Sequence, residues 1–160
     1  MASRKPLVIV SGQVQQLQAG DTLDASTTEV DVVSKTNGNV GALVIGTPVY
    51  VKNDGTVDKT KADASGTVQT LGLVKDLSVD PSSAGIIQTD GVLTATAAQW
   101  DAVAGTTGGL APGAVYFLDA ANAGKLTATA PSATGQFVVR GGLARSATEL
   151  DISTTAPIKL

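Results

Sequence analysis

Short stretches in which apolar and polar residues alternate recur along nearly the whole chain. Residues 7–18 begin with Leu-Val-Ile-Val and then alternate, and residues 28–33 read Thr-Glu-Val-Asp-Val-Val. Similar short runs occupy residues 84–88, 91–96 and 149–153. Alternation with a period of two places one face of a strand toward a core and the other toward solvent. The pattern therefore predicts an all-β fold.

Two segments of the chain echo each other. Residues 46–74 contain Gly-Thr-Pro-Val-Tyr-Val, a polar turn and a later strand-like run, and residues 112–144 repeat this order around Ala-Val-Tyr-Phe-Leu. Tyr50 and Tyr116 hold matching positions in this comparison. Each copy predicts a three-stranded meander, and two such meanders joined by residues 75–111 predict a small β-barrel or sandwich.

Local turn and cap signals add detail to this picture. Asn53-Asp54-Gly55 predicts a hairpin turn of two residues, because such turns need a positive φ at Asn or Asp and at Gly. One short helix is predicted over residues 97–103, with Thr96 as its N-cap and Gly105 ending it. On this helix Trp100 is expected to plug one end of the barrel, in preference to serving as a stacking platform for a ligand.

The first 35 residues differ from the rest of the chain. They contain no aromatic residue and few long apolar side chains. We expect residues 1–35 to form an extended N-terminal arm or edge hairpin that becomes ordered against a partner, and residues 36–160 to form the β-domain.

Composition removes much of the usual catalytic chemistry. Among the 160 residues there is no His and no Cys, which excludes disulfides, thiolate nucleophiles and a Ser-His-Asp triad. The net charge is −3 and only 16% of residues are charged, without the clustered Lys and Arg that nucleic-acid binding needs. The apolar runs are also too short for a membrane span or a signal peptide. We therefore expect no nucleic-acid partner and no membrane partner.

The remaining polar residues form no recognisable catalytic or metal site. The acidic pairs close in sequence, such as Asp21 with Asp24 and Asp54 with Asp58, are expected to be solvated turn or surface residues. A loop containing Asn53, Asp54, Asp58 and Asp63 lacks the ligand alternation of a calcium loop. Tyr50 and Tyr116 are expected to be core residues with hydrogen-bonded hydroxyls. The sequence predicts no catalytic residue, metal ligand or cofactor, and hence no enzyme.

Longer stretches of the sequence resemble phage proteins. The segments 108–119, 123–140 and 142–152 are similar, in this order, to a C-terminal β-domain that recurs in virion proteins of tailed bacteriophages. Residues 6–23 resemble the N-terminal segment of many phage head and tail structural proteins. No catalytic residues accompany this resemblance.

The resemblance and the short length imply a capsid decoration (cement) protein that binds the outer surface of the shell and bridges its subunits. The implied partners are the major capsid protein and other copies of the chain, with a trimer favoured, and the implied location is the outer capsid surface after synthesis in the host cytoplasm. The alternative is a tail-fibre or baseplate module that recognises host-surface glycans. Contact with the capsid or a neighbouring subunit, by strand addition, is expected at Leu7, Val8, Ile9, Val10, Val14 and Leu17.

Overall fold

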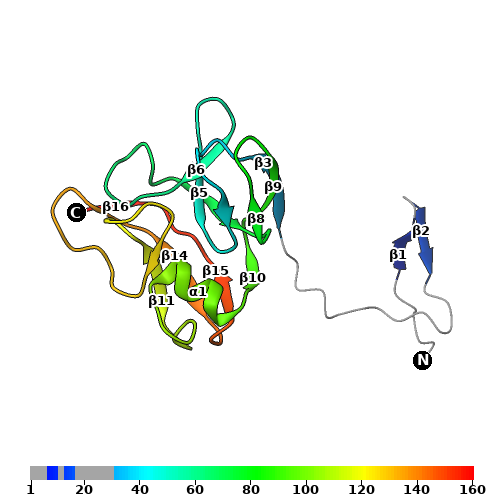
Figure 1. Cartoon of the computed structure of the whole chain (residues 1–160). Helices are drawn as coiled ribbons and strands as arrows, with labels where there is room; N and C mark the ends of the chain where they lie inside the picture. Colours follow the sequence, from blue (N-terminus) through cyan, green and yellow to red (C-terminus); the bar gives the residue numbers. More distant parts are fainter. Residues whose placement is uncertain (1–6, 11–12, 17–30) are drawn as a thin grey trace.

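Strands are the main regular elements of the computed structural model, which describes residues 7–10, 13–16 and 31–160 (Figure 1). A first five-stranded sheet has the order β3 (Val32–Thr36), β9 (Ala84–Gln88), β7 (Thr70–Val74), β5 (Pro48–Val51), β6 (Val57–Lys59). A second has the order β10 (Gly91–Thr94), β15 (Glu149–Ile152), β14 (Arg140–Ala144), β11 (Val115–Leu118), β12 (Leu126–Thr127). The two-stranded sheets are β1 (Leu7–Val10) with β2 (Gln13–Gln16), β4 (Leu43–Val44) with β8 (Ser78–Val79), and β13 (Phe137–Val138) with β16 (Ile158–Lys159).

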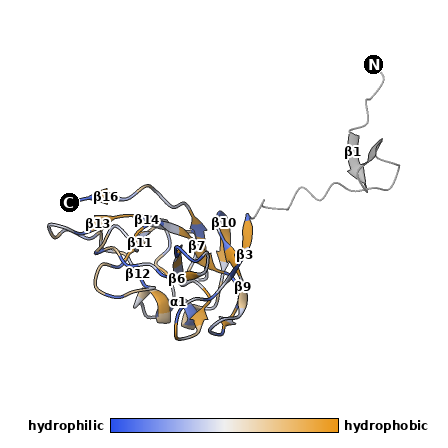
Figure 2. Cartoon of the chain, turned by 90° about the horizontal axis from the view of Figure 1, so that it is seen from above, coloured by the Kyte–Doolittle hydropathy of each residue, from blue (hydrophilic) through white to orange (hydrophobic). Residues whose placement is uncertain are grey.

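The all-β prediction is confirmed, and of the two predicted architectures the sandwich-like one is observed. Each five-stranded sheet is antiparallel and ends in two edge strands, so neither closes into a barrel within the described residues. The expectation that Trp100 plugs a barrel end is therefore wrong. Figures 1 and 2 place β3 and the C-terminal β16 at opposite ends of the body formed by residues 31–160.

The internal duplication is larger than the sequence comparison predicts. Each copy contributes five strands to its sheet, and the two strand orders correspond one to one: β3 with β10, β9 with β15, β7 with β14, β5 with β11, and β6 with β12. We call residues 32–88 the first unit and residues 91–152 the second unit. The segment expected to join two meanders therefore supplies β9 to the first sheet and β10 to the second.

The pairing register corrects the alignment of the two units by one residue. Val49 lies opposite Gly72 and Tyr116 lies opposite Gly142, and each pairing is followed by a register shift. Val49 therefore corresponds to Tyr116, and Tyr50 corresponds to Phe117. A shift by one position moves a side chain to the other face of a strand, so the two tyrosines have different surroundings.

Two apolar clusters form the core. The first unit encloses Leu43, Val49, Val57, Val74, Val79 and Ile87. The second unit builds its cluster around Trp100, Tyr116 and Leu118, and the first unit contributes Ile45, Ala62, Val68 and Leu73 to it. A backbone hydrogen bond from Gly124 N–H to the Thr60 carbonyl (2.7 Å) also joins the two units. The two units therefore share one of their cores.

The predicted helix is confirmed. It spans α1 (Ala97–Ala104), one residue beyond the predicted end, and buries Trp100 and Val103. Thr96 and Gln99 form a capping box at its start, and Gly105 ends it in the left-handed conformation with a φ of 63°. The Thr96 and Gln99 side chains accept from backbone N–H groups at the start of the helix, and the Gly105 N–H donates to the Asp101 carbonyl at its end.

The hairpin between β5 and β6 differs from the predicted two-residue turn. Gly55 N–H donates to the Lys52 carbonyl (2.9 Å), and Lys52 N–H donates to the Thr56 carbonyl (2.8 Å). Of Asn53, Asp54 and Gly55, only Gly55 has a positive φ, of 82°. This is a three-residue loop in which a turn is followed by one left-handed glycine.

The N-terminal boundary expected after residue 35 falls within β3. This strand pairs with β9 along its whole length, from Val32 opposite Gln88 to Thr36 opposite Ala84. Near the other end, the C-terminal tail is extended and its β16 pairs with β13.

Candidate functional site

The predicted contact residues lie mainly in the small sheet near the N-terminus. Leu7, Val8, Ile9 and Val10 form β1, and Val14 lies in β2 directly opposite Ile9. Leu17 lies outside the described residues. Among the described residues, β1 and β2 pair only with each other. Each strand of this sheet therefore has an open edge that another strand can extend. Such an extension would stabilise the sheet, because a two-stranded hairpin alone is only marginally stable in water.

A second open edge is formed by β3. Thr89 N–H donates to the Asp31 carbonyl and Asn37 N–H donates to the Ser83 carbonyl, both at 2.8 Å. With this antiparallel register, the backbone groups of residues 33 and 35 also face β9, because hydrogen-bonded pairs alternate along the ladder. The N–H and carbonyl groups of residues 32, 34 and 36 therefore point to the free edge, and all three residues are exposed. The body offers a backbone docking edge directly after the N-terminal segment.

An apolar groove lies between the two units. Its volume is about 250 Å³, and it is lined by Val44, Ile45, Leu77, Ala98, Gln99 and Ala102. Leu77 is 71% exposed and Val44 is 41% exposed. The sequence analysis did not identify this groove, because its residues come from three segments that only the folded chain brings together.

Carboxylates in the body mainly hold loops. Asp101 accepts hydrogen bonds from Gly109 N–H (2.8 Å), Thr106 Oγ1 (2.9 Å) and Gly108 N–H (3.0 Å). The bond from Gly109 is the main reason that the pKa of Asp101 is lowered from its usual value, and those from Thr106 and Gly108 lower it further against the effect of burial. This carboxylate fixes the loop that follows α1.

The acidic residues weighed as a calcium loop do not converge. Asp54 binds Thr56 and Lys52, and Asp58 accepts a hydrogen bond from Asn39 Nδ2 (2.6 Å). Asp63 forms an ion pair with Lys61 (2.6 Å). Over residues 31–160 and the two short N-terminal strands, no group of three or more acidic side chains is placed to hold a metal ion. The same part of the chain contains no helix with the length and hydrophobicity of a membrane span.

The two tyrosines differ in burial, as the one-residue offset between the two units predicts. Tyr116 is fully buried and its hydroxyl accepts a hydrogen bond from Ala111 N–H (3.0 Å), which confirms the expectation for this residue. Tyr50 is only partly buried and lines a surface hollow with Lys52, Asn53, Asp54 and Gly66. The expectation that Tyr50 is a core residue is therefore wrong, because the one-residue offset places it on the other face of its strand.

Comparison with known proteins found few similar chains. No family model matches the sequence, and no curated protein matches it. A chain in a solved structure described as "The capsid of Myoviridae Phage XM1" is similar with a TM-score of 0.45 and 23% sequence identity. The similar region covers 89% of this chain and 93% of that chain.

Proposed function

We propose that this protein is a structural component of a phage virion that binds the outer surface of the capsid and stabilises the shell by bridging capsid subunits. The role is non-catalytic. The observation that carries the proposal is the sheet of β1 and β2, whose strands pair only with each other among the described residues. Its position in the segment that resembles phage head and tail proteins supports the same role.

Strand addition is the mechanism that we propose for capsid binding. Open strand edges bind a partner through backbone hydrogen bonds, which supply affinity, while alternate side chains supply specificity. The contact residues proposed for the capsid or a neighbouring subunit are Leu7, Val8, Ile9, Val10, Val14 and Leu17. In this arrangement β1 and β2 become part of a larger sheet, which is more stable than a hairpin of two strands.

The chain length between the two parts suits a bridging role. β2 ends at Gln16 and β3 begins at Val32, so fifteen residues lie between them. A fully extended segment of this length spans at most about 54 Å. The proposed assembly is a small homo-oligomer, a trimer, in which each copy holds a neighbouring capsid subunit through its N-terminal segment.

The first prediction tests this role on undecorated capsids. Adding the full chain is expected to raise the melting temperature of the shells, and deletion of residues 1–24 is expected to abolish both binding and the rise. Within the full chain, Ile9→Asp is expected to weaken binding because it places a charge at a proposed contact position. Gln15→Asp places the same charge in the same sheet at a position outside the proposed contact set, and is expected to bind normally.

Two results would contradict the proposal. The first is normal shell stabilisation by the truncated protein, provided that its thermal unfolding matches that of the full chain. The second is an unchanged capsid melting temperature together with binding of the full chain to host cells, which would favour a fibre or baseplate module. Light scattering of the full chain at micromolar concentration measures its oligomeric state in solution, and a monomer there would contradict a preformed trimer.

A further inference from the structure

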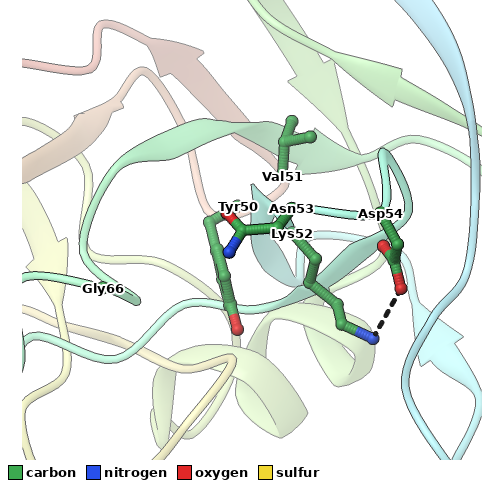
Figure 3. A pocket seen from close by; sticks show the side chains of 6 residues that line it. All are labelled: Tyr50, Val51, Lys52, Asn53, Asp54 and Gly66. Carbon is green, nitrogen blue, oxygen red and sulfur yellow. Dashed lines mark ion pairs between the residues drawn. The ribbon is translucent and has the colours of Figure 1, made fainter.

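A surface hollow beside the β5–β6 turn combines an aromatic ring with several polar groups. Its volume is about 370 Å³, and it is lined by Tyr50, Val51, Lys52, Asn53, Asp54 and Gly66. Figure 3 shows the Tyr50 ring standing between the chain at Gly66 and the Lys52 side chain. Tyr50 follows the fully buried Val49 on β5, and the register of β5 with β6 is regular, so alternation along the strand places this ring on the opposite face.

The polar side of the hollow is held in place by the turn. Asp54 Oδ1 accepts hydrogen bonds from Thr56 Oγ1 (2.6 Å) and Thr56 N–H (3.0 Å). Lys52 Nζ lies 3.3 Å from Asp54 Oδ2 and donates to the Gly38 carbonyl at 3.4 Å. The hydrogen bonds from Thr56 are the main cause that lowers the pKa of Asp54 to about 2, so this carboxylate is charged at neutral pH. The Lys52 and Asp54 side chains are therefore arranged before any ligand arrives.

Several groups in the hollow are available to a ligand. Neither the Tyr50 hydroxyl nor the Asn53 amide has a hydrogen-bond partner among the described residues, and Asn53 is exposed. Lys52 and Asp54 carry opposite charges, so the two ionic side chains in the hollow sum to zero. Val51, which is 41% exposed, adds an apolar surface.

We propose that this hollow binds a neutral sugar unit of a glycan. A pyranose ring has one apolar face of C–H groups, which suits the Tyr50 ring, and a rim of hydroxyls, which suits the Asn53 amide and the Lys52–Asp54 pair. A phosphate would require net positive charge and a metal ion would require several free carboxylates, and this hollow offers neither. Binding sites of this type combine an apolar surface with a few placed polar groups.

The second unit supplies an internal control. Phe117 corresponds to Tyr50 there and lacks the hydroxyl. The Asp119 carboxylate, in the corresponding turn, accepts hydrogen bonds from Ala121 N–H (2.6 Å), Asn122 N–H (3.2 Å) and Asn122 Nδ2 (3.0 Å). The duplicated fold therefore presents the proposed sugar site only in the first unit.

This activity goes beyond shell stabilisation and does not depend on it. A small open site of this kind binds weakly, with a Kd on the order of 1 mM. Many copies on one particle would raise the effective affinity for a glycan-coated surface, because several sites bind at once. The capsid-melting test and a sugar titration can fail separately.

The second prediction is tested by NMR titration of the ¹⁵N-labelled full chain. The probes are the methyl glycosides of glucose, galactose and N-acetylglucosamine, with inorganic phosphate as the charged comparison. At least one glycoside is expected to shift amide signals of residues 50–56 and 66, while phosphate shifts none of them. Tyr50→Phe and Asn53→Ala are each expected to raise the Kd about fivefold, the effect of losing one hydrogen bond. Phe117→Leu, which removes the corresponding ring in the second unit, is expected to leave the Kd unchanged.

The variants keep this test independent of folding. Asn53 is exposed in a turn, so Asn53→Ala is expected to retain the thermal unfolding midpoint of the parent protein. The absence of shifts with all three glycosides would overturn the proposal. Glycoside shifts that persist with an unchanged Kd in both Tyr50→Phe and Asn53→Ala would also overturn it, as would stronger shifts at these amides with phosphate.

Discussion

Asp101 determines the course of the chain after the helix. One carboxylate receives the N–H groups of Gly108 and Gly109 and the hydroxyl of Thr106, so a loop rich in glycine is held by a single side chain. Hydrogen bonds to the charged form favour ionisation, in agreement with the lowered pKa of this group.

The third prediction follows from this pKa. Because the folded state lowers the pKa of Asp101, its contribution to stability is present above the ordinary Asp pKa of about 3.9 and is lost as the pH falls through the folded value. Asp101→Asn is expected to lower the thermal midpoint by a few degrees at pH 7, and the gap from the parent protein is expected to close in acid. Thermal unfolding between pH 7 and pH 2 measures this gap.

The exposed Asp90 supplies the control for Asp101. Asp90→Asn removes the same charge from the turn between β9 and β10 and is expected to leave the midpoint nearly unchanged at each pH. If the difference in thermal midpoint between Asp101→Asn and the parent protein stays constant down to pH 2, the charged Asp101 carboxylate does not stabilise the loop.

At the scale of the elements, two corresponding glycines allow the strands to approach each other. A Cβ atom on Gly72 would lie 2.2 Å from the Gln88 carbonyl oxygen, and one on Gly142 would lie 2.5 Å from the Asp151 carbonyl oxygen. Gln88 and Asp151 occupy corresponding places on β9 and β15. The contact is with backbone atoms, which cannot rotate away as a side chain can.

The fourth prediction concerns these glycines. Gly142→Ala and Gly72→Ala are each expected to destabilise the fold by about 1–3 kcal/mol. The added methyl group pushes β14 away from β15 in the first variant and β7 away from β9 in the second. Urea unfolding measures the change. Gly66→Ala is the control, because a Cβ atom there would meet nothing within 4 Å. Equal stability of Gly142→Ala and Gly66→Ala would show that the neighbouring strand yields without cost.

Local signals predicted elements well where short-range chemistry determines them. Thr96, Gln99 and Gly105 mark both ends of the helix, and alternation located β9, β10 and β15. Alternation could not locate the bulges at Leu71 of β7 and Gly141 of β14, since an extra residue in one strand shows only against its paired neighbour. The incorrect expectation for Tyr50 has another source, because the sequence comparison aligned Tyr50 with Tyr116 whereas the strand pairing aligns Val49 with Tyr116.

At the scale of the whole molecule, the two units are coupled through Leu73. This residue belongs to β7 of the first sheet, is fully buried, and packs in the cluster that contains Trp100 and Tyr116 of the second unit. Trp100 approaches the first unit elsewhere as well, since its Cζ3 would lie 2.9 Å from a Cβ atom on Gly46. Unfolding of either unit therefore exposes apolar surface of the other.

The fifth prediction is that both units unfold in one transition. Leu73→Ala is expected to destabilise the protein by about 2–5 kcal/mol and to shift Trp100 fluorescence and the NMR signals of β5 and β9 to the same lower urea midpoint. Leu77→Ala, at a residue that is 71% exposed, is the control and is expected to change stability by less than about 0.5 kcal/mol. Separate midpoints for the two sheets would contradict this coupling.

The sequence by itself determined the all-β class, the helix with both caps, the presence of a duplication and the lack of imidazole and thiol chemistry. Each of these depends on residue type, on spacing within a few positions, or on an order of residues that recurs along the chain. Only the tertiary structure decided the order of the strands, the one-residue offset between the units, which tyrosine is buried, and the hollow beside Tyr50. These features depend on which backbone groups pair across the sheets, and residues far apart in the chain, such as Val49 and Gly72, meet only after that pairing is complete.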